Sequence, residues 1–344
     1  AAIMRQPFPA LEEAASPGGK QVARRTCPPA FDSLLPDAAP VALLTSSEER
    51  AVKPPDHHFV PKPSDEGNVR ACPESWSTLK DLYPLVLPKY KLAFCFIPKV
   101  ACTQFKDLFN YMNGMGEESL GFGHDYSLSE WWRDGFNLSK EEITRENGWK
   151  FATFTRDPAL RYLSAFGDVC QSENSTFGFH QWSCCGPQVD VRYAASDDRY
   201  QIKAFKSRVQ MDVRAGRAYP DQHWASQTEV LKTCGWNNFK PETLDYWGVL
   251  AGDVNAQVKD MLQVVGHRDD ATVDRFFPPA GVAVLESDGH SSLLKGEAPD
   301  YIDAETLEGI VQLYAEDYRN MPGIGCAFTE PLLAKLKAAN ASDR

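Results

Sequence analysis

The stretch KLAFCFIPKVACTQFKDLFNYM, Lys91 to Met112, contains the pattern from which the fold can be read. Its first half is almost entirely apolar and aromatic, as in a β-strand that is buried on both faces. A turn with Pro98, Lys99 and Thr103 but no glycine follows it. The second half places apolar side chains at the spacing of an amphipathic helix, namely Phe105, Leu108, Phe109 and Met112. The stretch therefore predicts a buried strand that enters a helix through a turn carrying one lysine and one threonine.

This turn is suited to binding a phosphate-like group. A tight strand-to-helix turn directs free backbone N–H groups and the positive end of the helix dipole toward one point. Nucleotide-hydrolysing loops follow G-x-x-x-x-G-K-[ST], where the glycines let the backbone wrap a polyphosphate and the last hydroxyl holds Mg²⁺. PKVACT lacks both glycines, so we predict a shorter cradle for one phosphate-like group without a metal, formed by Lys99, Val100, Ala101, Cys102, Thr103 and Gln104. The alternative is a buried strand end with a solvated lysine and a threonine cap.

A second segment, WKFATFTRDPALRYLSAFGDV, repeats the strand–turn–helix order from Trp149 to Val169. Arg156 stands at the carboxyl end of the predicted strand, where ligands of open α/β sheets bind. Ser164 lies about two turns into the predicted helix. Arg156 and Ser164 are therefore candidate ligands of a second phosphate, which the arginine can grip bidentately. Arg161 fits either a structural ion pair or a ligand role.

These two segments resemble the 5′-phosphosulfate and 3′-phosphate motifs of the Golgi carbohydrate sulfotransferases. That group includes the chondroitin, dermatan and HNK-1 enzymes and is related to the heparan 2-O-sulfotransferases. Three later segments are similar to the family in order and spacing: DQHWASQTEVLKTCGW, LDYWGVL and LEGIVQLYAEDYRN. The likeness covers roughly residues 90 to 320. Gln104 and Phe105 stand where the family usually has Asn-Trp, and Phe166 stands where it usually has Tyr.

The resemblance implies a donor and a set of ligands. The donor is 3′-phosphoadenosine-5′-phosphosulfate (PAPS), the nucleotide product is PAP, and no metal is required. Lys99 would neutralise the 5′-phosphosulfate, with Thr103 and the backbone from Ala101 to Gln104 completing the cradle. Arg156 and Ser164 would hold the 3′-phosphate. The resemblance also implies an α/β, P-loop-like sulfotransferase fold, with a central parallel sheet flanked by helices.

The acceptor hydroxyl requires a general base. His124, in GFGHDYSL, lies between the two donor motifs and resembles the G-H-x-S-Y region that carries the base of the 2-O-sulfotransferases. His223, in QHW, is its rival, although the neighbouring Trp224 indicates a packed position. A carboxylate such as Asp125 or Glu130 is the third alternative. We favour His124.

The rest of the chain predicts one catalytic domain with an N-terminal extension. More than half of the 24 prolines precede Lys91, so residues 1–75 are predicted to form an extended Pro-rich arm or stem, and residues 76–344 one domain. Predicted strands are Leu92–Ile97, Trp149–Thr155 and Tyr246–Leu250. Predicted helices are Thr103–Met112, Ala159–Val169, Ile202–Val213, Val254–Val265 and Ala304–Tyr318. Strands followed by helices favour a parallel sheet with crossover helices.

Net charge and cysteine content limit the possible partners of the protein and indicate its cellular compartment. A net charge of −11 weighs against nucleic acid as a partner. Among the nine cysteines no pair has C-x-x-C spacing, which argues against structural zinc. We expect packed thiols at Cys95 and Cys102, and candidate disulfide bridges at Cys170, Cys184, Cys185 and Cys234. With N-x-S/T sequons at Asn137, Asn174 and Asn340, these bridges favour the Golgi lumen or another secretory compartment.

No apolar run reaches the roughly 18 residues that span a bilayer, so we expect any targeting segment to lie outside this chain. The densest basic stretch is Arg192, Arg199, Lys203, Lys206, Arg208, Arg214 and Arg217. We read it as a solvated helix face, with a rim that attracts an anionic acceptor as the alternative. The sequence leaves the oligomeric state open.

The leading interpretation is thus a PAPS-dependent sulfotransferase that acts on a hydroxyl, with a saccharide as the expected acceptor. The same chemistry on a small alcohol, lipid or secondary metabolite is the alternative, because an acidic chain is an unusual match for a heavily sulfated polymer. A non-catalytic nucleotide-binding module is the alternative from another class. A P-loop kinase is disfavoured, because PKVACT lacks the glycines and no metal-binding Asp strand is apparent.

Overall fold

The computed structural model of the 344-residue chain describes residues 69–70, 84–115, 136, 138–170, 186–187, 198–218, 222–279, 298–321 and 323–342. Of the predicted arm, only residues 69–70 are among them. They form β1 (Val69–Arg70), which pairs antiparallel with β5 (Gly186–Pro187). The boundary predicted at residue 75 stays a prediction.

A four-stranded sheet lies at the centre of the domain. Its order is β2 (Leu85–Leu87), β3 (Leu92–Cys95), β4 (Lys150–Thr155) and β6 (Tyr246–Val249). β3, β4 and β6 run parallel, whereas β2 joins the edge antiparallel to β3. The predicted α/β class with a central parallel sheet is confirmed, and the three predicted strands lie within a residue or two of their observed bounds.

Aromatic side chains bury one face of this sheet. Phe94 on β3 and Phe154 on β4 pack against Phe105 of α1 (Cys102–Met112), with ring centroids 4.4 and 4.9 Å from that of Phe105. Phe277, after α8 (Asp270–Phe276), packs on Phe105 at 4.7 Å. Gly248 of β6 leaves room for this cluster, because a Cβ there would lie 2.4 Å from the Phe154 ring. The apolar half of Lys91 to Met112 is therefore a fully buried strand, as predicted.

α6 (Gln227–Phe239) covers the opposite face and is tied to it covalently. Cys95, the last residue of β3, forms a disulfide with Cys234 of α6, and the Phe151 ring packs edge-on against Phe239. The prediction of a packed thiol at Cys95 is therefore wrong, because the strand residue faces α6 where a second thiol meets it. Cys170 and Cys326 are also disulfide-bonded, whereas Cys102 is free.

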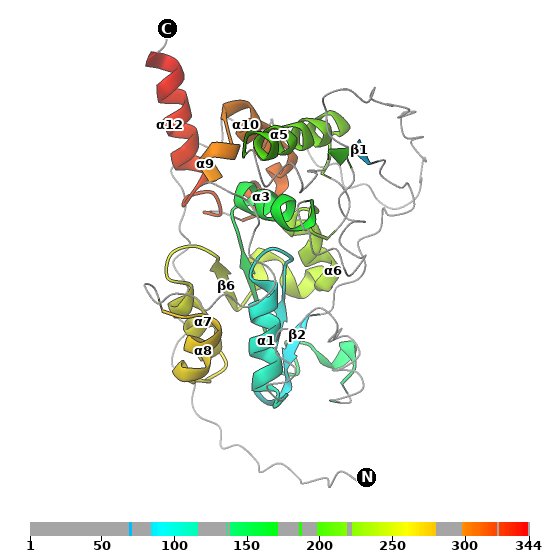
Figure 1. The fold of residues 1–344 in the computed structure, drawn as a ribbon. Coiled ribbons are helices and arrows are strands. Elements are labelled where there is room, and N and C mark those ends of the chain that lie inside the picture. The colour runs from blue at the N-terminus through cyan, green and yellow to red at the C-terminus, as the bar shows by residue number, and fades with distance from the viewer. Residues whose placement is uncertain are drawn as a thin grey trace, which may run out of the picture.

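A second helical layer lies beyond the carboxyl ends of the strands (Figure 1). α3 (Pro158–Val169), α5 (Asp198–Ala215) and α10 (Ala304–Leu313) pack together there. The other helices in the described part of the chain are α7 (Val254–Gln263), α9 (Ala298–Tyr301), α11 (Ala315–Asn320) and α12 (Thr329–Ser342), with short 3-10 turns at Pro88–Tyr90, Lys140–Glu142 and Pro241–Thr243. The predicted helix Ala304–Tyr318 is in fact two, α10 and α11. They separate at the buried Tyr314, whose hydroxyl donates to the Trp224 carbonyl at 2.5 Å.

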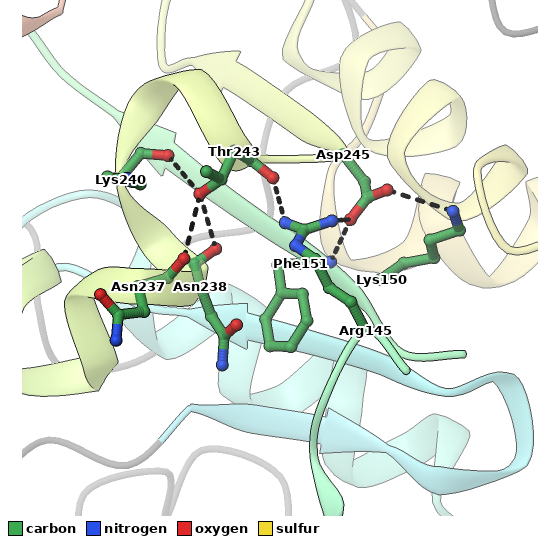
Figure 2. Close-up of polar contacts among 8 residues, drawn as sticks. All are labelled: Arg145, Lys150, Phe151, Asn237, Asn238, Lys240, Thr243 and Asp245. Carbon is green, nitrogen blue, oxygen red and sulfur yellow. Dashed lines mark hydrogen bonds and ion pairs between the residues drawn. The ribbon is translucent and has the colours of Figure 1, made fainter. Parts of the chain in front are cut away.

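A polar cluster ties β4 to β6 at the ends of the strands remote from α3 (Figure 2). Asp245, just before β6, accepts a hydrogen bond from the backbone N–H of Phe151 at 3.0 Å. Its carboxylate also pairs with Arg145 at 2.7 Å and with Lys150 at 3.2 Å. Arg145 donates a further bond to the Thr243 carbonyl. This cluster aligns the two parallel strands and leaves their carboxyl ends available for a site.

Candidate functional site

The predicted cradle is a strained turn between β3 and α1. Lys99 and Ala101 adopt left-handed backbone angles, with φ of 68° and 50°. The turn is closed by a hydrogen bond from Val100 N to the Ile97 carbonyl at 3.1 Å. Among the described residues, no side chain caps the first turn of α1. Non-glycine residues adopt this conformation at an energetic cost, which native structures retain mostly at functional sites. The residues that lead into the N-terminus of α1 therefore adopt a left-handed backbone conformation that is usually occupied by glycine.

The Lys99 side chain reaches across to α3. Its Nζ lies 2.7 Å from Oδ2 of Asp168, and the two side chains are 13% and 16% exposed. Sequence reasoning did not select Asp168. The available signal was helical spacing, since Asp168 follows the candidate ligand Ser164 by four residues and so lies on the same helix face.

Arg156 directly follows the carboxyl end of β4, as predicted, and it also lies next to this turn. Its Nη1 donates to the Lys99 carbonyl at 3.1 Å. Burial lowers the pKa of the guanidinium, and the neighbouring Asp157 opposes that shift. The structure therefore places the Arg156 guanidinium against the backbone of Lys99, the other predicted phosphate-binding residue. Thr103, Gln104 and Ser164 are partly exposed, with Ser164 about midway along α3.

The main chain of Arg156 is fixed by α6. Gln227 accepts from Arg156 N at 3.0 Å and donates to the Arg156 carbonyl at 2.8 Å. The N–H groups of Gln227 and Thr228 both donate to Asp317, each at 2.8 Å. Gln227 and Asp317 belong to the later segments whose family likeness carried no assigned role. The geometry gives both residues a structural role, because Gln227 holds the Arg156 backbone and Asp317 holds Gln227.

Arg161 has a structural role and is not exposed as a phosphate ligand. It is 1% exposed and donates to three backbone carbonyls: Pro98 at 2.9 Å, Ala225 at 2.5 Å and Gln222 at 2.9 Å. The first carbonyl precedes Lys99, and the other two lie on either side of His223. Arg161 therefore holds the segment that contains His223 against the turn that contains Lys99.

The candidate bases are divided between the described residues and the rest of the chain. His223 is partly exposed, whereas the neighbouring Trp224 is buried. His124, Asp125 and Glu130 lie outside the described residues. The choice among them stays a prediction.

The basic stretch of α5 is partly neutralised. Arg208 is fully buried, bonds to Asp212 at 3.2 Å and stacks on the Trp224 ring at 4.3 Å. Lys206 pairs with Asp303 at 2.6 Å. The exposed basic residues here are Lys203, Arg214 and Arg217, whereas Arg192 and the Arg199 side chain lie outside the described part. The predicted solvated helix face fits Lys203 and Arg214 on α5 and is wrong for the buried Arg208, while Arg217 lies beyond the end of the helix.

Within the described residues, no three His, Cys, Asp or Glu side chains come together as a metal site would require. No helix in that part of the chain is both long and apolar enough to cross a bilayer.

Comparison with known proteins identifies the family. Residues 84–320, more than half of the chain, match the sulfotransferase family. The chain belongs to that family. It is also similar to human carbohydrate sulfotransferase 9, with 33% identity over 92 residues. That alignment covers 26% of this chain and 20% of the human protein, so the similarity spans about a fifth of the relative. No solved structure matches this sulfotransferase-family chain.

Proposed function

We propose that this chain is a PAPS-dependent sulfotransferase that moves a sulfuryl group to a hydroxyl of a carbohydrate. One observation carries the proposal: the strained Lys99–Ala101 turn, with an uncapped helix N-terminus behind it, lies next to Arg156 on the neighbouring parallel strand. Two cationic positions side by side suit a nucleotide with phosphate groups on both the 5′ and 3′ sides of its ribose. Family membership and the similarity to a carbohydrate sulfotransferase point the same way.

The reaction is an in-line displacement at sulfur, in which the acceptor oxygen bonds to sulfur and the bond from sulfur to the phosphate oxygen breaks. PAPS supplies the activated sulfuryl group. Lys99 would stabilise the negative charge that develops on the departing phosphate. The backbone N–H groups of Ala101 to Gln104 and the Thr103 hydroxyl would hold the same phosphate, and Arg156 with Ser164 the 3′-phosphate. The acceptor proton would pass to a general base, His124 by preference or His223.

Compartment and acceptor follow from disulfides and charge. A buried disulfide between Cys95 and Cys234 favours an oxidising lumen such as the Golgi. The net charge of −11 favours an acceptor with few sulfate groups of its own, and it keeps a small alcohol, lipid or secondary metabolite as the second candidate acceptor.

Nucleotide selectivity tests the binding half of the proposal. Calorimetry should show that PAP binds more tightly than AMP, because only PAP carries the 3′-phosphate. Arg156→Ala should remove most of this difference, with exposed Arg319→Ala as the matched control. Equal binding of PAP and AMP by the wild-type protein would refute the 3′-phosphate assignment.

Turnover tests the catalytic half. Radiolabelled PAPS is offered with a panel of saccharides, alcohols and lipids, with and without Mg²⁺. We expect Mg²⁺-independent transfer to a saccharide, reduced by about two orders of magnitude or more in Lys99→Ala. Exposed Lys89→Ala should leave the rate unchanged. PAP binding without turnover on any acceptor would favour a non-catalytic nucleotide-binding module.

A further inference from the structure

The Lys99–Asp168 ion pair spans the two motifs of the candidate donor site. Lys99 belongs to the turn after β3, and Asp168 lies one helical turn beyond Ser164 on α3. The two charged atoms are 2.7 Å apart, and both side chains are mostly shielded from solvent, at 13% and 16% exposure. Reduced solvent screening makes such a pair stronger than an exposed one. The lysine expected to meet the donor is therefore engaged by an internal anion.

This arrangement competes with the binding of an anionic nucleotide. A phosphate at the cradle would need the ammonium of Lys99 as its counter-charge, and it would lie close to the Asp168 carboxylate. Like charges at such short range repel strongly where solvent is partly excluded. Breaking the Lys99–Asp168 ion pair and the repulsion between the phosphate and the Asp168 carboxylate both oppose binding. The Arg156 guanidinium donates its hydrogen bond to the Lys99 carbonyl, which is a neutral acceptor.

We propose that Asp168 is a positioning residue that occupies Lys99 until a nucleotide able to engage Arg156 as well displaces it. This rests on the proposed function, in which Lys99 binds the 5′-phosphate side of the donor. The internal carboxylate keeps the empty cradle close to neutral. A small anion such as inorganic sulfate would contact only the Lys99 site, and these contacts alone would have to displace Asp168. A nucleotide with two phosphate positions gains contacts at both sites and displaces it more readily. Asp168 thereby sets selectivity for a doubly phosphorylated nucleotide.

The test is a double-mutant cycle on PAP and inorganic sulfate affinity, measured by calorimetry without turnover. The proteins are wild type, Asp168→Asn, Lys99→Met and the double variant. Asp168→Asn should bind PAP about tenfold more tightly, and sulfate binding should become detectable, since one partly buried charge-assisted contact no longer competes. In the Lys99→Met background the same substitution should change PAP affinity by less than about twofold. Glu316→Gln, which removes the exposed pair with Lys232 at 2.9 Å, is the matched control and should bind PAP as wild type does.

Three outcomes decide the matter. Unchanged or weaker PAP binding by folded Asp168→Asn overturns the proposal, because a merely structural carboxylate would give that result. An equal gain in the Lys99→Met background also overturns it, since the gain would then reflect overall charge and not the pair. If Lys99→Met itself binds PAP like wild type, the assignment of Lys99 under the proposed function fails instead. Should Asp168→Asn not fold, Asp168→Ser takes its place in the cycle.

Discussion

The Gln227 amide hydrogen-bonds both main-chain polar groups of Arg156, although the two residues are 71 positions apart. The bonds measure 3.0 Å from Arg156 N to Oε1 and 2.8 Å from Nε2 to the Arg156 carbonyl. Gln227 is itself fully buried, and its own N–H donates to Asp317. The direction in which the Arg156 side chain leaves β4 is therefore set by a side chain from α6.

Gln227→Ala should lower the free energy of unfolding and weaken PAP binding together. The substitution removes the partner of the Arg156 N–H and of the Arg156 carbonyl, both partly buried, which costs about 2–4 kcal/mol at most for the two groups. Urea denaturation measures the first effect and calorimetry the second. Gln257→Ala is the control, because Gln257 makes the same two kinds of bond at the end of β6, with Val249 N at 2.9 Å and the Ala251 carbonyl at 2.8 Å. It should lose stability and keep PAP affinity. Equal loss of PAP affinity in both variants would contradict a specific role for Gln227.

The general base can be assigned by combining pH profiles with substitution. If His124 takes the acceptor proton, its neutral form is active, so kcat/KM falls as pH decreases through a pKa near the reference value of about 6.5. His124→Ala should lose roughly 10² to 10⁴ in rate and keep PAP affinity. His223→Ala should mainly lower stability, because His223 precedes the buried Trp224. The reverse pattern, with the fold intact, would make His223 the base. Normal rates in both variants would point to a carboxylate.

The Cys95–Cys234 disulfide should contribute substantially to stability. It closes a loop with a sequence separation of 139 residues, and removing a bridge of this kind costs about 2–5 kcal/mol. Cys234→Ala should therefore unfold at lower urea concentration under oxidising conditions. Cys102→Ser, which replaces a free cysteine, should keep the wild-type midpoint. Identical midpoints for Cys234→Ala and wild type would show that β3 and α6 are held together without the bridge.

His267 should make stability depend on pH. Its ring packs on Tyr90 with centroids 4.4 Å apart, and partial burial lowers its pKa, assisted by Lys89 and opposed by Asp269. Between this lowered pKa and the reference value of about 6.5, the unfolded chain binds the proton more readily than the folded one. The stability contributed by neutral His267 is thus complete above that reference value and decreases as pH falls through the lowered pKa. His267→Phe keeps the ring contact and should remove this component from urea titrations at a series of pH values. An unchanged pH profile would argue against it.

The sheet and the strand-to-helix turns after β3 and β4 could be predicted from the sequence, because those features depend on local patterns. Continuous apolar runs mark β3 and β4, and Pro158 with Asp157 marks the start of α3, where Asp157 accepts from Ala159 N at 2.9 Å as expected of a cap. β2 was not predicted, since it has three residues and no periodicity. α6 was also not predicted, and its interior is interrupted at Gly235, where φ is 114°.

Contacts between distant segments were not accessible to the same reasoning. Nothing in the pattern around Asp168 says that Lys99 is its partner, and nothing around Cys95 says that its thiol meets Cys234. These pairs depend on how α3 and α6 cross the ends and the face of the sheet. The role of Arg161 was left open between ion pair and ligand, and only its three carbonyl partners settle that it is structural.

The absence of glycine in the turn from Lys99 to Ala101 would affect the entropy of anion binding at the proposed site. A glycine at position 101 would relieve the left-handed strain of Ala101, but it would also widen the range of shapes available to the free loop. With alanine at this position the free loop has fewer conformations, so it loses less conformational entropy when an anion binds. A larger part of the contact energy then remains as affinity. The turn thus carries backbone strain in this structure, and in return the ordering that a flexible loop would undergo at each encounter is already complete.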